Sequence, residues 1–298
     1  MLNKEKIKLG IAPIGWTNDD MPALGGDNTF EQCISEMALA GFTGCEVGNK
    51  YPKDTAVLKA ALDLRGMRIA SKWFSSFLAT KPYEETETEF LKELDYLEAL
   101  GADRINISEQ SNSVQGNEEL SIFDNKVIFT DEEWDKLCDG LNKLGEIAVN
   151  RGFKLCFHHH MGTGVQTIAE TERLMEGTDK RFVFLCYDSG HFTFSGENPL
   201  YILSKYPERI GHIHLKDVRP DVLKQATQGN WSFLKSVREG TFTVPGDGCV
   251  DFTSIFAEIE KNGYEGWLLV EAEQDPAKAN PFQYAQMARN YIKRMIDI

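Results

Sequence analysis

The sequence lacks the features that would place the protein in a membrane or on nucleic acid. Nowhere in its 298 residues do about 18 apolar residues run together, the length that crosses a bilayer. The opening residues, M-L-N-K-E-K-I-K, contain no apolar segment of the kind a signal peptide needs. Lys and Arg total 32 against 46 Asp and Glu, and a net charge of −14 repels phosphate backbones. We therefore expect a protein that binds neither membranes nor nucleic acid.

Paired cysteines, linkers and low-complexity segments are also missing. The six cysteines form no C-x-x-C pair, and three of them lie inside strand-like apolar runs, which is typical of thiols buried in a reducing cytoplasm. Hydrophobic residues make up 42% of the chain, enough for a large core. Because no linker divides the chain, we expect one domain over residues 1–298.

Glycines mark a repeating unit of helix, turn and strand. A helix-like segment ends and a strand-like segment begins at Gly41, Gly66, Gly101, Gly152 and Gly263, as expected of left-handed C-cap residues. The capping-box patterns T29-F-E-Q32 and T130-D-E-E133 predict two helix starts. We count eight candidate strands, near residues 7–12, 43–48, 68–74, 104–109, 154–160, 182–188, 210–217 and 266–273. Alternating units of this kind predict an α/β fold with parallel strands and favour a (β/α)8 TIM barrel, although an open sheet gives the same local pattern.

The run Ile210–Asp217, I-G-H-I-H-L-K-D, places His212, His214 and Lys216 on one face of a strand. A lone buried His is more often a hydrogen-bonded core residue than a ligand. Two further apolar runs, Lys154–His160 and Arg181–His191, end in similar chemistry, however, and a third ends in E-A-E. Polar groups converging from several strands indicate a site.

In a barrel, polar residues at the carboxyl ends of strands face the active-site mouth. That rule selects the following candidates: Glu46, Lys72, Asn106, Glu109, His158, His160, Asp188, His191, His214, Lys216, Asp217, Glu271 and Glu273. Imidazole and carboxylate are the ligands of divalent transition metals, so Asp188, His214 and Glu271 are the natural core of a metal site. The long segments Asn112–Thr130 and Pro220–Val250 follow strands and should cover the mouth.

Three stretches near the end of the chain resemble the xylose-isomerase-like barrel superfamily, namely D188-S-G-H191, H212-I-H214-L-K-D217 and G263-Y-E-G-W-L-L-V-E271. The resemblance implies a metal held by Glu, Asp, His and Glu from strands five to eight. The last three match Asp188, His214 and Glu271, but the strand-five position is His158. His158 either replaces the carboxylate, which shifts preference from magnesium towards manganese, cobalt or zinc, or has left the metal shell.

A closer resemblance covers nearly the whole chain. The stretches G10-I-A-P-I-G-W-T-N-D-D-M-P, F42-T-G-C-E-V-G-N-K-Y-P and S71-K-W-F-S-S are similar to the inosose dehydratase family of myo-inositol catabolism. The resemblance implies elimination of water from 2-keto-myo-inositol, a polyol ketone, with cobalt or manganese and with glutathione. No glutathione site is identifiable in the sequence. The sequence is also compatible with a homo-oligomer. The alternatives are an epimerase or isomerase on the same fold, and a barrel that binds sugar without catalysis.

The residues suit such an elimination. Removing a proton next to a ketone creates an enediolate, which a divalent cation stabilises. Lys72, His191, Lys216 and Glu46 are the candidate acids and bases, unranked by the sequence. The substrate-binding candidates are Trp16 and Trp73, which either stack on the ring or simply pack, with Asn106, His160, Asp217 and Arg219.

Lys72 is expected to share its strand face with Ala70 and Phe74 and to enter the barrel interior near the metal. There it would either relay a proton as a desolvated amine, or stay charged and bind a substrate hydroxyl or Glu46.

Overall fold

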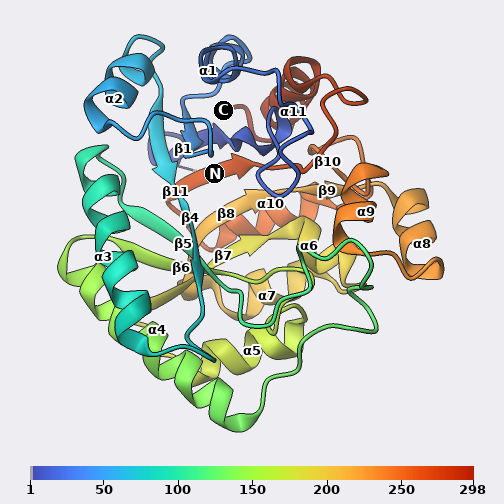
Figure 1. Cartoon of the computed structure of the whole chain (residues 1–298). Helices are drawn as coiled ribbons and strands as arrows, with labels where there is room; N and C mark the ends of the chain where they lie inside the picture. The colour runs from blue at the N-terminus through green and yellow to red at the C-terminus, as the bar shows by residue number, and fades with distance from the viewer. Residues whose placement is uncertain (1–2) are drawn as a thin grey trace.

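A ring of parallel strands forms the centre of the fold in a computed structural model that describes residues 3–298, and the helices surround it (Figure 1). The sheet order is β3-β2-β1-β11-β8-β7-β6-β5-β4. Its strands are β1 (Ile7–Ile11), β2 (Gly44–Glu46), β3 (Arg68–Ser71), β4 (Trp73–Ser76), β5 (Arg104–Glu109), β6 (Lys154–His158), β7 (Val183–Asp188), β8 (Ile210–Leu215) and β11 (Gly266–Val270).

The two ends of this sheet are halves of one strand. Only Lys72 separates β3, which pairs with β2, from β4, which pairs with β5. The Asn106 amide donates to the Lys72 carbonyl (3.0 Å), so this strand joins both edges and closes the barrel. The nine strands therefore occupy eight positions, and the predicted (β/α)8 barrel is confirmed.

The helices begin and end where their capping residues predict. Thr130 and Glu133 form a reciprocal capping box, the Thr29 side chain accepts from the Gln32 amide, and all five predicted C-cap glycines have φ between +62° and +94°. The helices are η1 (Pro13–Gly15), α1 (Phe30–Leu39), α2 (Thr55–Asp63), α3 (Tyr83–Ala99), α4 (Asp131–Asn150), α5 (Ile168–Gly177), α6 (Ser189–Phe194), α7 (Pro199–Lys205), η2 (Pro207–Arg209), α8 (Pro220–Gln228), α9 (Phe233–Arg238), α10 (Phe252–Lys261) and α11 (Pro281–Ile296). Within residues 3–298, none of these helices combines the length and the apolar character that crossing a bilayer requires.

Apolar side chains fill the barrel interior beneath its mouth. Ala12, Ala70, Trp267 and Leu269 form a separate small cluster there. Gly44 is required beside it, because a Cβ at this position would lie 2.3 Å from the Trp267 ring. The floor of the barrel is therefore packed beneath the polar residues at the carboxyl ends of the strands.

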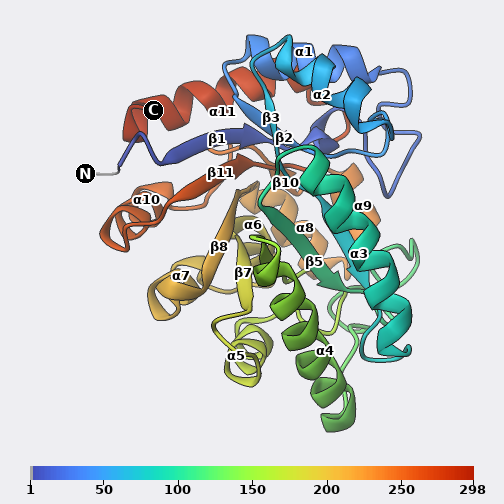
Figure 2. The same cartoon turned by 90° about the vertical axis from the view of Figure 1, so that its left-hand side faces the viewer.

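The two long segments, residues 112–130 and 220–250, pack together over the mouth, as predicted. The second contains α8, α9 and β10 (Phe242–Thr243), which pairs with β9 (Asp217–Val218). Val114 and Ile122 of the first segment share an apolar cluster with Phe233 and Val237 of the second. The chain ends lie on the opposite side, where the strands begin (Figure 2), and Lys4 Nζ is 2.7 Å from Asp297 Oδ2.

Candidate active site

The last residue of β7, Asp188, shows how the fold positions a side chain that was predicted to be a metal ligand. Asp188 is also the N-cap of α6, so its Oδ1 accepts the backbone N–H groups of Gly190 (2.8 Å) and His191 (2.9 Å). These bonds fix the carboxyl group and leave Oδ2 facing the barrel axis. Asp188 Oδ2 lies 3.4 Å from His158 Nε2 on β6 and 3.6 Å from His214 Nδ1 on β8.

The four ligands predicted from the sequence come together at this point. His214 Nδ1 is 2.8 Å from Glu271 Oε2, just beyond β11. His158, Asp188 and Glu271 also form a group with His191 in which one potential ligand atom from each residue lies within 4.8 Å of all the others. His191, predicted only as an acid or base, is thus a neighbour of the ligand set.

A buried ammonium group stands among these carboxylates. Lys216 Nζ lies 2.6 Å from Glu271 Oε1, 2.9 Å from Glu273 Oε2 and 3.2 Å from Asp188 Oδ2. It is also 3.0 Å from His191 Nε2 and 4.7 Å from the centre of the Phe242 ring. Burial works against the charge, but the three carboxylates outweigh it and raise the pKa of Lys216 well above its ordinary value. Lys216 is therefore a fixed positive charge.

Burial would raise the carboxylate pKa values here, but the nearby cations work in the opposite direction. The pKa of Asp188 lies well below its ordinary value chiefly because the Lys216 ammonium outweighs burial. His214 and Lys216 likewise lower the pKa of Glu271 to about 2. Glu273 differs, because burial dominates and raises its pKa to about 7. The site therefore holds ionised carboxylates beside a carboxyl group that exchanges protons near neutral pH.

The donor set fits a divalent metal ion. Both ring nitrogens of His158, Asp188 Oδ2 and His214 Nδ1 are buried without a hydrogen-bond partner among the described residues. Buried polar atoms without a hydrogen bond are costly, and three of these atoms lie close together, with Asp188 Oδ2 3.4 Å from His158 Nε2 and 3.6 Å from His214 Nδ1. The carboxylates of Asp188 and Glu271 add negative charge that a cation would neutralise.

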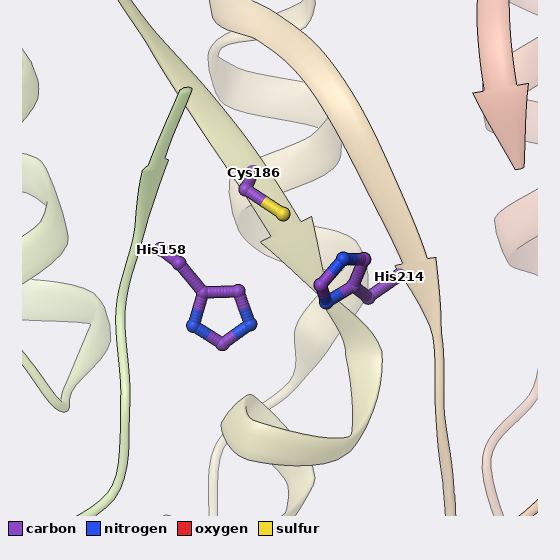
Figure 3. A group of neighbouring side chains, drawn as sticks. All are labelled: His158, Cys186 and His214. Carbon is purple, nitrogen blue, oxygen red and sulfur yellow. The ribbon is translucent and has the colours of Figure 1, made fainter. Parts of the chain in front are cut away.

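A thiol lies directly beneath this point. His158, Cys186 and His214 come from the inner faces of three neighbouring strands, and each offers one potential ligand atom within 4.8 Å of the other two. Figure 3 shows the two imidazoles facing each other with Cys186 set back between them. Burial raises the pKa of the Cys186 thiol to about 12, so it stays protonated in the absence of an ion.

A recess of about 560 Å³ opens onto the cluster. Trp73 borders it. The Trp73 ring lies edge-on to the rings of His158 and His160, with ring centroids 5.4 Å and 5.7 Å apart. Other members of the predicted set also border it, namely Glu46, Lys72, His160 and Glu271. Glu273, a predicted strand-end residue, borders it too, and so do residues with no predicted role, namely Asp19, Asp20, Asn49, Gln110, Ser113 and Gln115. A usable signal existed for Asp19 and Asp20, because they follow the first strand and so lie at the mouth.

Four predicted substrate contacts are engaged elsewhere. Asp217 accepts from the amides of Val218, Gly246, Gly248 and Val250, so its carboxylate anchors the segment after β10. Arg219 donates to the Gly240 and Phe242 carbonyls and pairs with Asp247, which ties down the same segment.

Trp16 and Asn106 are also held by protein partners. Trp16 is 1% exposed and donates from Nε1 to Glu36 (2.6 Å), so it packs beneath α1. Asn106 donates from Nδ2 to Glu46 (2.7 Å), and it does not border the recess. The predicted substrate-binding roles of Trp16, Asn106, Asp217 and Arg219 therefore conflict with their observed contacts.

The expectation that the Lys72 amine enters the barrel interior was wrong. Its Nζ lies 2.5 Å from Glu93 Oε2 and 5.8 Å from the Tyr96 ring, both on the outer helix α3. The cause is a register shift between β2 and β3, where Cys45 pairs with Ile69 and Glu46 with Ser71. One extra residue reverses the alternation, so Ser71 faces Glu46 inside the barrel and Lys72 points outward.

Lys72→Met is therefore expected to leave kcat nearly unchanged, because the amine is paired with Glu93 rather than with the cluster. Solvent deuterium should still exchange into the substrate α-carbon at the parent's rate. Steady-state kinetics and NMR of the recovered substrate measure the two quantities. A fall in kcat of about 10²-fold or more would contradict this and restore Lys72 as a proton-transfer group.

The fold and the cluster define a class of protein. A family model described as "Xylose isomerase-like TIM barrel" matches residues 34–295, and the chain belongs to this family. Curated proteins named inosose dehydratase match the chain from end to end. The protein from Clostridium beijerinckii is 62% identical and that from Geobacillus thermodenitrificans 59% identical, with 98% of each chain covered in both cases. Within the barrel family, the chain belongs with the inosose dehydratases.

Solved structures with the same fold are much more distant in sequence. The "IOLI protein with a binding zinc atom" superimposes with a TM-score of 0.73 at 16% identity, over 97% of this chain and 98% of that one. The probable 3-DHS dehydratase AsbF from Bacillus anthracis superimposes with a TM-score of 0.71 at 14% identity, over 96% of this chain and 98% of that one. At such identities, the likeness supports the fold alone.

Proposed function

We propose that this protein is a hydro-lyase that removes water from 2-keto-myo-inositol (scyllo-inosose), giving 3D-3,5/4-trihydroxycyclohexane-1,2-dione. The observation that carries the proposal is the 57–62% identity, over nearly the full length, to curated proteins named inosose dehydratase. The recess supports it, because a six-carbon ring fits within about 560 Å³ beside the cluster. We also propose that the enzyme has a single domain and is cytoplasmic, which agrees with its composition and fold. Both are compatible with a homo-oligomer.

Manganese or cobalt is the metal that we propose for His158, Asp188, His214 and Glu271. Asp188, His214 and Glu271 match the ligand types that the family resemblance implies. A neutral imidazole at His158 favours such metals over magnesium. The printed title of one structural neighbour records bound zinc, which supports metal binding in this fold. When bound, the ion would supply Lewis-acid stabilisation for the negative charge that develops on the ketone oxygen as the α-proton leaves.

The remaining steps belong to the protein's own groups. The Lys216 ammonium is fixed beside the cluster and stabilises negative charge as the α-proton leaves. His191 Nε2 lies 3.0 Å from Lys216 Nζ, so the ammonium can donate to it and hold the imidazole in place, and Glu273 Oε1 lies 3.8 Å from the same nitrogen. Trp73 and His160 border the recess and would orient the ring. These contacts favour His191 and Lys216, rather than Lys72 and Glu46, as the protein groups that take part in the elimination.

The test is a dehydration assay on chelator-treated enzyme. With scyllo-inosose and either Mn²⁺ or Co²⁺ we expect the ultraviolet absorbance of the dione to appear, and without metal we expect none. Parallel reactions with glutathione test the second cofactor that the family resemblance implies. Conversion of substrate to an isomer with no loss of water would contradict the proposal and favour an epimerase on the same fold.

A further inference from the structure

We propose that Glu46 is a positioning residue that orients His214 for metal binding, rather than an acid or base of the reaction. This inference rests on the metal site of the proposed function. Glu46 is the last residue of β2, and β2 lies across the barrel from β8, which carries His214. Glu46 is one of the candidate acids and bases predicted from the sequence, so its contacts decide between the two roles.

A single oxygen of Glu46 accepts from several buried donors. Glu46 Oε1 lies 2.7 Å from Asn106 Nδ2, 3.0 Å from His214 Nε2 and 3.3 Å from His212 Nε2, and it also accepts from the Ser71 hydroxyl. Because these buried donors already surround Oε1, that oxygen is not free to accept a proton from a substrate.

The two nitrogens of His214 face different partners. Nε2 faces Glu46, whereas Nδ1 lies 2.8 Å from Glu271 Oε2 and 3.6 Å from Asp188 Oδ2 and has no hydrogen-bond partner among the described residues. A carboxylate that accepts from one ring nitrogen places the proton there and turns the other nitrogen towards the metal. Such outer contacts typically change metal affinity by about 10- to 100-fold.

Glu46 is itself held in place by Ser71 and Asn106. Ser71 comes from β3 at the register shift, and Asn106 from β5 donates to both Glu46 and Ser71 Oγ (3.0 Å). The β-bulge that sends Lys72 outward is therefore the same feature that turns Ser71 inward against Glu46. The orientation of His214 depends on a network spread over four strands.

The experiment measures binding of Mn²⁺ alone to chelator-treated enzyme by the loss of the free-ion electron paramagnetic resonance signal. Glu46→Gln keeps an acceptor oxygen and should weaken Mn²⁺ binding by about 10-fold, whereas Glu46→Leu removes the acceptor and should weaken it by about 100-fold. In proton NMR of the metal-free parent, we expect a low-field, slowly exchanging imidazole N–H from His214, which Glu46→Leu should lose.

Glu109→Gln is the matched control. Glu109, the last residue of β5, was predicted to face the mouth, but it does not border the recess. It is fully buried and accepts from Ser76 Oγ (2.7 Å), from the Leu78 amide (2.9 Å) and from the amides of Ala79 and Ser111. It should affect stability but leave Mn²⁺ affinity within about twofold. This result separates a positioning role from a general loss of packing.

Several results would overturn the inference. One is unchanged Mn²⁺ affinity in Glu46→Leu, and another is an equal loss in Glu109→Gln. A fall in kcat with unchanged Mn²⁺ affinity would also do so, because it would assign Glu46 to the chemistry. Failure of the proposed function is a different observation, namely a parent enzyme that binds Mn²⁺ but forms no dione.

Discussion

Asp188→Asn is expected to lower kcat/KM by about 10³-fold or more while the barrel stays folded. The substituted amide keeps an oxygen that can accept from the Gly190 and His191 amides, so the N-cap of α6 should survive. The anionic Oδ2, which faces His158 and His214, is lost. Metal ions stabilise such transition states by several kcal/mol, and each 1.36 kcal/mol corresponds to a factor of ten.

Mn²⁺ binding to the variant and dione formation are measured side by side with circular dichroism. Asp251→Asn is the matched control, because Asp251 is also an N-cap aspartate, whose Oδ1 accepts from the Ser254 amide, and it lies at the start of α10 away from the recess. It should retain parent activity. Full metal occupancy in Asp188→Asn would count decisively against Asp188 as a ligand.

Lys216→Met is expected to destabilise the metal-free protein by about 3–5 kcal/mol, because it leaves buried carboxylates without their cation. Lys216 is fully buried, and its Nζ lies within 3.2 Å of an oxygen of Asp188, Glu271 and Glu273. Methionine fills a similar volume without the charge. Activity should fall as well, since the fixed ammonium beside the recess is removed.

Urea unfolding in the presence of a chelator measures the loss, and repeating it with Mn²⁺ tests the cause. A divalent ion supplies positive charge to the same carboxylates, so it should stabilise Lys216→Met more than it stabilises the parent. Lys143→Met is the control, because Lys143 pairs with Asp139 on an exposed helix face, where ion pairs contribute little. A metal-free Lys216→Met protein as stable as its parent would show that Lys216 does not neutralise the cluster.

The sequence predicted the fold well because the relevant signals are local. Glycine at the C′ position and a capping box depend on a few consecutive residues, and the alternating strands and helices depend on short windows. Local signals of the same kind were also enough to predict the proposed ligand set. Asp188, His214 and Glu271 end successive strands, and the carboxyl ends of parallel strands must meet at one mouth.

Partners distant in sequence could not be predicted in this way. Asp217 appeared as a strand-end polar residue like the ligands, but it accepts from amides at residues 246, 248 and 250, which only the folded segment brings near. Arg219 and Trp16 were misassigned for the same reason. Glu46 was recognised as part of the site, but its contact with His214 crosses 168 residues of chain.

The sequence by itself determined the barrel and the strand ends that carry the proposed ligands, because helix capping and strand alternation are properties of neighbouring residues. The tertiary structure alone decided which way the side chains after Ala70 point. One extra residue in the pairing of β3 with β2 turned Ser71 inward and Lys72 outward. Such a register shift depends on the pairing of two strands and leaves no mark on the alternation of either strand alone.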